Sequence, residues 1–224
     1  MLLLIAGCVS IKPENLKRET LEMRHESLDI LRLTSHVFKA TLDIKKHHLT
    51  GLLVIKRMDS LFTPPPAQKG NTPPAAPPQT GRGVCAATYR IVFVNEVGMT
   101  FFDLEMKADS FNVISCFASL NKKALMHIFE TDFRILLWSG ALKNENFYRQ
   151  ATTNNLVVLG KAGKYHAWQT YSAAGDTLYR IAARSNIADP AIITFDKYKD
   201  GFPLKIIIEN PVIGMKLSFR KLVQ

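Results

Sequence analysis

The stretch "YRIVFVNEVGMTFFDLEM", from Tyr89 to Met106, decides the fold. Before "NEVG" the large apolar residues Tyr89, Ile91 and Phe93 stand at alternate positions. After it Phe102, Leu104 and Met106 alternate with Asp103 and Glu105, and both patterns are those of strands that bury one face. A turn on Val97 and Gly98 then predicts three apolar cross-strand pairs on one face: Tyr89 with Met106, Ile91 with Leu104, and Phe93 with Phe102. The stretch therefore predicts an antiparallel hairpin.

A third strand extends this hairpin into a meander. A second turn at residues 108–109 predicts two more apolar pairs on the same face: Phe111 with Met106, and Val113 with Leu104. In this register Cys85 lies on that face and Cys116 on the opposite one. A disulfide between them would need geometry that a sheet does not provide, so we expect two separate apolar fillers.

Strand patterns recur along the rest of the chain. Residues 37–58 alternate in the same way and predict a hairpin, with Lys46, His47 and His48 at its turn. From Asn154 onward six further runs are separated by turn signals such as Asp200-Gly201. In total the sequence predicts about 10–11 antiparallel strands, and a sheet of this size tends to curl.

Two stretches predict helices. Pro13 suits the first turn of a helix within residues 13–33. A second helix, ending near "FRILLWSG", has a face formed by Leu125, Ile128, Phe129, Asp132, Phe133 and Leu136. The predicted fold class is therefore α+β: an incomplete, strongly curved antiparallel β-barrel with helices covering its concave apolar face. The alternative is that this face is simply a packed core.

The N-terminus carries a candidate lipidation site. Ile5-Ala6-Gly7-Cys8 fits the bacterial lipobox, in which the cysteine thiol is lipidated and becomes the first residue after cleavage. The preceding apolar run is shorter than the usual ~7–15 residues, so the match is either a signal truncated at its start or accidental. We expect a signal peptide over residues 1–7, a lipidated tether over 8–15 and a single domain over 16–224.

A proline-rich loop interrupts this domain at residues 63–83. Seven of the eleven prolines lie here, and such a run favours an extended state outside the sheet. Because strands resume on both sides, we interpret it as an exposed insertion. It is either a motif for a partner or a passive excursion.

Charge and missing motifs narrow the function. The net charge of +10 suits an anionic partner, but the sequence has no arginine-rich run and no nucleic-acid-binding motif. It also has no catalytic motif, and no cysteine has metal-ligand spacing. We therefore expect no enzyme, cofactor, metal or nucleic acid. An apolar concavity that buries acyl chains, at about 0.8 kcal/mol per methylene, would leave no catalytic signature.

The hairpin "YRIVFVNEVGMTFFDLEM", the helix ending "FRILLWSG" and the closing "PLKIIIENPVIGMKLSFRKL" resemble the LolB family of outer-membrane lipoprotein receptors. The resemblance covers about residues 85–223 and agrees with a lipidated Cys8. It implies a curved half-barrel with a helical lid. It further implies a lipid-anchored monomer on the periplasmic face of a Gram-negative outer membrane, which receives lipoproteins from a soluble periplasmic carrier of the same fold.

The resemblance also assigns a role to the hairpin turn. In the family an exposed leucine in an Asn-Pro-Leu-Gly loop helps to insert cargo into the membrane. Here the loop is Asn95-Glu96-Val97-Gly98, with glutamate in place of proline and valine in place of leucine. Both changes would weaken insertion. Val97 is therefore either a membrane-contacting tip or part of an ordinary turn.

The sequence thus predicts an acyl-chain cavity lined by Tyr89, Ile91, Phe93, Phe102, Leu104, Met106, Phe111, Val113, Phe129, Phe133 and Leu136. The expected function is to bind the acyl chains of lipoproteins and help insert them into the outer membrane. Two alternatives remain: a carrier for another amphiphilic lipid or lipid-linked product, and a structural lipoprotein subunit of an outer-membrane assembly.

Overall fold

The computed structural model describes residues 16–19, 35–58, 87–107, 109–138, 142–162, 165–184 and 191–222. These residues form one antiparallel sheet of thirteen strands and the helix α1 (Lys123–Trp138). The strands are β1 (Leu16–Glu19), β2 (Ser35–Ile44), β3 (His47–Met58), β4 (Thr88–Val94), β5 (Thr100–Met106), β6 (Phe111–Cys116), β7 (Lys143–Gln150), β8 (Leu156–Ala162), β9 (Tyr165–Tyr171), β10 (Leu178–Arg184), β11 (Ala191–Lys199), β12 (Phe202–Asn210) and β13 (Met215–Lys221).

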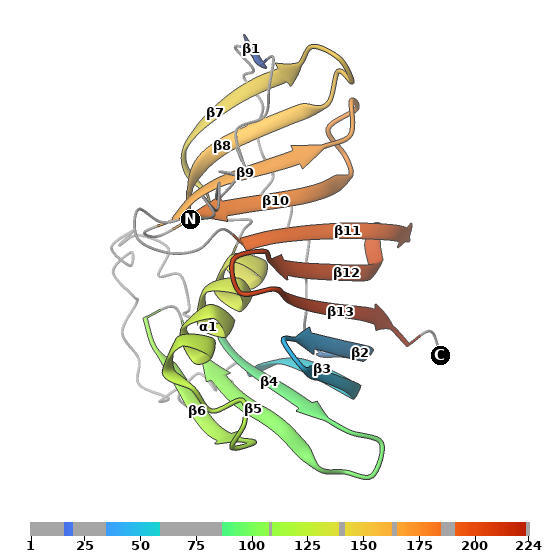
Figure 1. The fold of residues 1–224 in the computed structure, drawn as a ribbon. Coiled ribbons are helices and arrows are strands. Elements are labelled where there is room, and N and C mark those ends of the chain that lie inside the picture. Colours follow the sequence, from blue (N-terminus) through green and yellow to red (C-terminus); the bar gives the residue numbers. More distant parts are fainter. Residues whose placement is uncertain are drawn as a thin grey trace, which may run out of the picture.

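The strands follow the order β1-β7-β8-β9-β10-β11-β12-β13-β2-β3-β4-β5-β6. Figure 1 shows them in this order from top to bottom. Strands β1 and β6 are the two edges and do not pair with each other, so the sheet is not closed. The prediction of a large, open antiparallel sheet is confirmed.

Two strands were not predicted, and they pair with each other. β1 pairs with β7 at one edge of the sheet. The helix predicted within 13–33 is wrong at residues 16–19, which form β1, and the rest of that stretch lies outside the described residues. The sequence of β7, "KNENFYRQ", has no apolar alternation that would have marked it as a strand.

The register of the central meander is confirmed where it was predicted in detail. Tyr89 pairs with Met106, Ile91 with Leu104, and Phe93 with Phe102. Met106 pairs with Phe111 and Leu104 with Val113. Beyond these pairs the register shifts between Asp103 and Leu104, and Ile114 is left as the extra residue of a bulge. Cys116 consequently pairs with Phe102 and packs against the core, so its predicted place on the opposite face is wrong.

The first hairpin has a tighter turn than predicted. The turn consists of Lys45 and Lys46, and Lys45 has a positive φ of 53°. His47 and His48 belong to β3, where His47 pairs with Ile44. Farther along β3, Gly51 is buried and lies so close to the end of β4 that a Cβ would stand 1.9 Å from the Val94 carbonyl oxygen.

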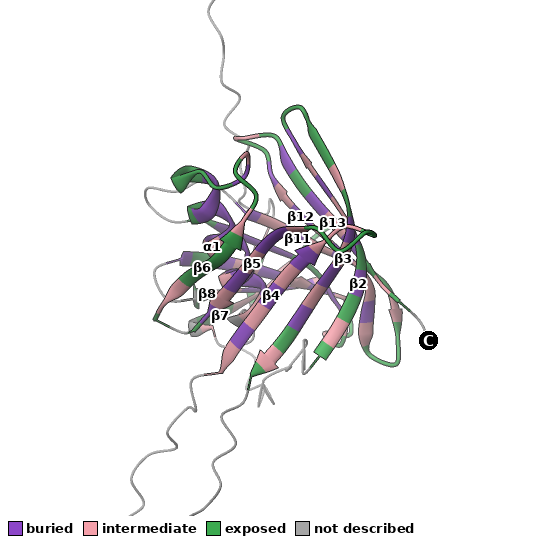
Figure 2. Ribbon diagram, turned by 90° about the horizontal axis from the view of Figure 1, so that it is seen from below, coloured by how far each residue is buried: buried purple, intermediate pink, exposed green. Residues whose placement is uncertain are grey.

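The sheet bends around α1. Phe129 of α1 lies 5.0 Å from Phe102 of β5 between ring centroids. On the same helix, Thr131 shares a hydrogen bond of 3.1 Å with the hydroxyl of Tyr165 in β9. Seven strands separate β5 from β9 in the sheet. One helix contacts both strands only because the sheet curves strongly, and Figures 1 and 2 show this curvature from two sides.

The core lies between α1 and the face of the sheet toward which the apolar residues alternate. On β2 the buried positions are Phe38, Ala40, Leu42 and Ile44, as the period of two predicts. Figure 2 shows the same alternation of buried and less buried residues along β4 and β5. Burying a large apolar side chain contributes about 1.5–3 kcal/mol, so these inward rows are the main stabilising feature of the sheet.

Candidate ligand-binding site

The predicted cavity residues mostly lie in this core. Of the eleven residues, Val113 is 38% exposed and Phe111 is partly buried. The remaining nine, on β4, β5 and α1, are buried. Phe102 contacts the rings of Phe93, Phe129 and Phe133 at centroid distances of 5.5, 5.0 and 6.3 Å. The structure brings these residues together as packed neighbours, and their contact with an acyl chain stays a prediction.

The hairpin tip is a well-defined turn. The Asn95 side-chain oxygen accepts hydrogen bonds from the backbone N–H groups of Val97, at 3.1 Å, and Met99, at 2.7 Å. Gly98 donates to the Asn95 carbonyl at 3.1 Å and adopts a φ of 88°, which suits glycine. The side chain of Val97 is 88% exposed, and Glu96 is also exposed. The turn therefore holds an apolar side chain in solvent at the end of a long hairpin.

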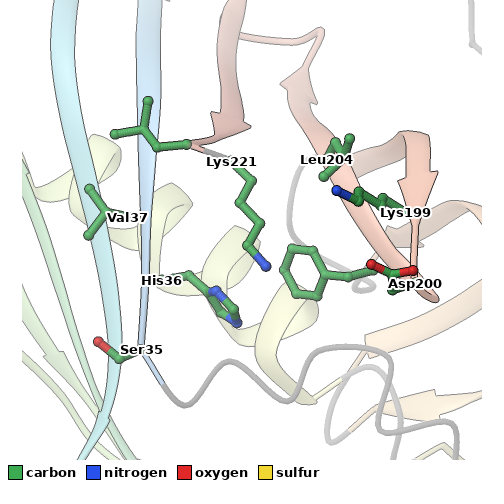
Figure 3. A pocket seen from close by; sticks show the side chains of 9 residues that line it. Ser35, His36, Val37, Lys199, Asp200, Leu204 and Lys221 are labelled. Carbon is green, nitrogen blue, oxygen red and sulfur yellow. The ribbon is translucent and has the colours of Figure 1, made fainter. Parts of the chain in front are cut away.

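A pocket of about 560 Å³ opens where β2 begins and β13 ends. Its walls come from the first residues of β2, from the β11–β12 hairpin and from the end of β13. The lining residues are Ser35, His36, Val37, Lys199, Asp200, Phe202, Leu204, Lys221 and Leu222. Figure 3 shows His36 and Lys221 reaching toward one another from neighbouring strands, with Lys199 and Asp200 across from them.

The β11–β12 turn positions one wall of this pocket. Asp200 and Gly201 have φ values of 51° and 74°, and Lys199 pairs with Phe202 across the turn. Two central residues with positive φ are characteristic of the tight turn that Asp-Gly favours. The turn signal in the sequence therefore corresponds to a real hairpin, which places a lysine and a phenylalanine side by side.

A phenylalanine ring organises the centre of the pocket. The Lys221 ammonium lies 4.3 Å from the centroid of the Phe202 ring. The imidazole of His36 lies 4.7 Å from the same ring and 6.1 Å from the ring of Phe38, which belongs to the core. The pocket is therefore continuous with the apolar inner face of the sheet.

Sequence reasoning did not identify this pocket. Its residues come from β2 and from the consecutive strands β11, β12 and β13, which are far from β2 in the chain, and no short motif connects the two parts. The available signal is a break in the row of apolar residues on the inner face. On β2, His36 occupies the inward position that precedes Phe38 and Ala40 in the sequence. Lys221 does the same beyond Leu217 and Phe219 on β13. Polar residues at inward positions mark the place where the core ends and a site begins.

A second, smaller pocket of about 120 Å³ lies beside the start of α1. The β2–β3 and β12–β13 turns form its other walls, and most of its lining is apolar. Buried polar atoms without a hydrogen-bond partner in the described residues include Ser119 Oγ in this pocket and both carboxylate oxygens of Asp132 on α1. Burial raises the pKa of the Asp132 carboxyl well above its usual value.

Other predicted sites lie outside the described residues or stay untested. Cys8, Cys85 and the proline-rich loop at 63–83 lie outside them. Within the described ranges no group of three histidine, cysteine or acidic residues could hold a metal ion. His48, at the start of β3, is hydrogen-bonded to Asp43 at 2.5 Å. Across these same ranges, α1 included, no helix has both the length and the hydropathy needed to cross a bilayer.

No model of a known protein family matches the chain, and comparison with curated proteins gives no match either. Among solved structures, the chain is similar to a LolA superfamily protein from Nitrosomonas europaea, with 11% identity, a TM-score of 0.47 and coverage of 88% of this chain and 89% of the other. It is also similar to a DUF1329 family protein from Desulfovibrio piger, with 12% identity, a TM-score of 0.41 and coverage of 88% and 87%. Both TM-scores are low, so the argument for a function rests on the chain's own residues.

Proposed function

We propose that this protein binds amphiphiles through the apolar inner side of its curved sheet, and that its physiological cargo is the acylated part of lipoproteins. The observation that carries the proposal is the pocket of about 560 Å³ at the end of that inner side. Its volume lies within the range of about 300–1,000 Å³ that is usual for ligand pockets. Contact between His36 and Phe38 connects it to the core, so a bound chain would extend along apolar residues.

The proposal includes a membrane-bound setting. Lipidation of Cys8 would anchor the protein to the periplasmic face of the outer membrane, where a soluble carrier of the same fold would deliver cargo to a monomeric receptor. The exposed Val97 would contact the membrane while the acyl chains transfer. A single valine buries little area in a bilayer, so this contact would guide the cargo and would not by itself hold the protein there.

A reconstituted delivery assay tests this function. An acylated lipoprotein bound to its periplasmic carrier is mixed with the lipid-anchored protein in liposomes, and transfer into the liposomes is followed over time. The proposal predicts that transfer requires the protein. Transfer at the same rate without it would contradict a receptor role.

A carrier for another amphiphilic lipid is the second candidate, and the lysines of the pocket favour it. The two candidates differ in the compound that the purified protein retains. A lipid or lipid-linked product in place of a lipoprotein would support the carrier. Tight packing with no retained amphiphile of any kind would favour a structural subunit of an outer-membrane assembly.

A further inference from the structure

We propose that the pocket at the start of β2 selects amphiphiles with an anionic head, such as a phosphate or a carboxylate. Lys221 and Lys199 would bind the head, while Phe202 and Leu204 would contact the first part of the chain. The inference rests on the amphiphile binding of the proposed function and belongs to its second candidate, the carrier for another amphiphilic lipid, because it specifies which amphiphiles enter the same inner face.

Lys221 lies where its ammonium could contact an anion in the pocket. It occupies an inward position of β13 after three buried apolar residues and is itself only partly buried, so its ammonium lines the pocket. Its ammonium lies against the Phe202 ring at 4.3 Å from the centroid. A ring face attracts a cation but leaves the N–H groups able to donate. Within the described part of the chain, neither Lys221 nor Lys199 forms an ion pair. An anion in the pocket would provide a counter-charge for both ammonium groups.

Basic side chains outnumber carboxylates around the pocket. Asp200 is the one carboxylate among the lining residues, against Lys199 and Lys221. On the outer face of the same strands, Lys205 pairs directly with Arg220, and Arg220 pairs with Lys39. Like charges directly opposite each other destabilise a sheet. Asp196, opposite Lys205, offsets part of this row.

The remaining lining of the pocket includes an apolar surface. Val37, Phe202, Leu204 and Leu222 are apolar and together make up nearly half of the lining residues. A small anion alone would leave this apolar surface exposed to water. A neutral amphiphile would leave the two lysines without a counter-charge. An anionic head on an apolar chain fits both parts of the pocket.

Calorimetric titration of the full-length Cys8→Ser protein tests the inference. The ligands are dodecyl phosphate, laurate and dodecyl maltoside, which share the dodecyl chain length and are used below their micelle concentrations, and inorganic phosphate. We expect the two anionic amphiphiles to bind at least about tenfold more tightly than the maltoside, which corresponds to ~1.4 kcal/mol. Tighter binding of dodecyl phosphate than of laurate would indicate a phospholipid-like head, and equal binding a general anion site.

The variants Lys221→Met and Lys199→Met keep an unbranched side chain that is one heavy atom shorter, and they remove its charge. Each should reduce the preference for anionic amphiphiles several-fold without weakening maltoside binding. Lys161→Met, which removes an exposed lysine on β8, is the matched control and should leave the preference intact. Circular dichroism and melting temperature verify that each variant is folded.

The outcomes separate the inference from the proposed function. Equal affinity for all three amphiphiles, or a preference that both lysine variants retain, would overturn the anionic selection and leave amphiphile binding standing. Binding of inorganic phosphate as tightly as dodecyl phosphate would also overturn it, because the chain would then contribute nothing. If no amphiphile binds, the proposed function fails as well.

Discussion

At the scale of single residues, the most unusual group is Asp132. It lies on α1 within an apolar face, only 2% exposed, and neither carboxylate oxygen has a partner among the described residues. A buried carboxyl without a partner favours its neutral form, and its pKa is accordingly raised. The sequence placed Asp132 on the buried face of the helix but gave no indication that it would be left unpaired there.

Asp132 should make stability depend on pH. Below a pH of about 4 the carboxyl is protonated in both the folded and the unfolded chain, and ionisation costs nothing. As the pH rises from there toward the raised pKa, the unfolded chain loses its proton while the folded chain keeps it. The free energy of unfolding therefore falls, by ~1.4 kcal/mol for each unit by which the pKa is raised.

Asp132→Asn removes this titration, so it should stabilise the protein near pH 7 and have a much smaller effect near pH 4. Urea denaturation at the two pH values measures the difference. Asp109→Asn, at an exposed position, is the control. A stability gain that is the same at both pH values would show that ionisation is not its cause.

Gly51 lies at a position where the neighbouring strand leaves no room for a side chain. A Cβ there would stand 1.9 Å from the Val94 carbonyl oxygen, which is a backbone atom and moves only with β4. Gly51→Ala should therefore lower the free energy of unfolding by about 1–3 kcal/mol or more. Thr50→Ala, at the exposed neighbouring position, should change it little. Equal stability of the two variants would mean that the two strands separate at this point without cost.

At the scale of elements, the β4–β5 hairpin combines a precise turn with an exposed apolar tip. Asn95 and Gly98 fix the turn by hydrogen bonds to backbone N–H groups and a positive φ, and neither role requires the side chain of Val97. Val97 is thus free to vary without loss of the turn. This separation makes the tip suitable for mutation.

Val97→Glu should slow lipoprotein delivery to liposomes while folding and amphiphile binding stay unchanged, because the substitution places a charge where the tip would enter the bilayer. Val212→Glu provides a matched control, since Val212 is 61% exposed in the β12–β13 turn. If both variants deliver cargo as fast as the unmodified protein, Val97 is part of an ordinary turn.

The elements differ in how far their sequences predicted them. The meander was predicted pair by pair, because regular apolar alternation specifies both the face and the register. The bulge at Ile114 could not be predicted in this way. The position of one extra residue depends on how both strands pack, and it changes no local sequence pattern. The pairing of β1 with β7 was missed for a related reason: β7 is polar, and its place at the edge is set by the rest of the sheet.

At the scale of the whole molecule, curvature connects the fold with the proposed function. The sheet curves enough for α1 to contact both β5 and β9. The number of strands predicted this tendency to curl, but not which residues would meet at the open end. The pocket joins the ends of β2, β11, β12 and β13, so it exists only once the sheet has formed. The site was therefore less predictable than the fold.

Native mass spectrometry of the full-length Cys8→Ser protein, purified without detergent, tests the central claim most directly. The spectrum is recorded before and after incubation with a dodecyl amphiphile, and any retained compound is extracted and identified. The account predicts a population of protein with one bound acyl-chain compound. If the head of that compound is anionic, Lys221→Met should make this population smaller. A bare protein in every spectrum, with no mass added after incubation, would contradict amphiphile binding and with it the function proposed for the curved sheet.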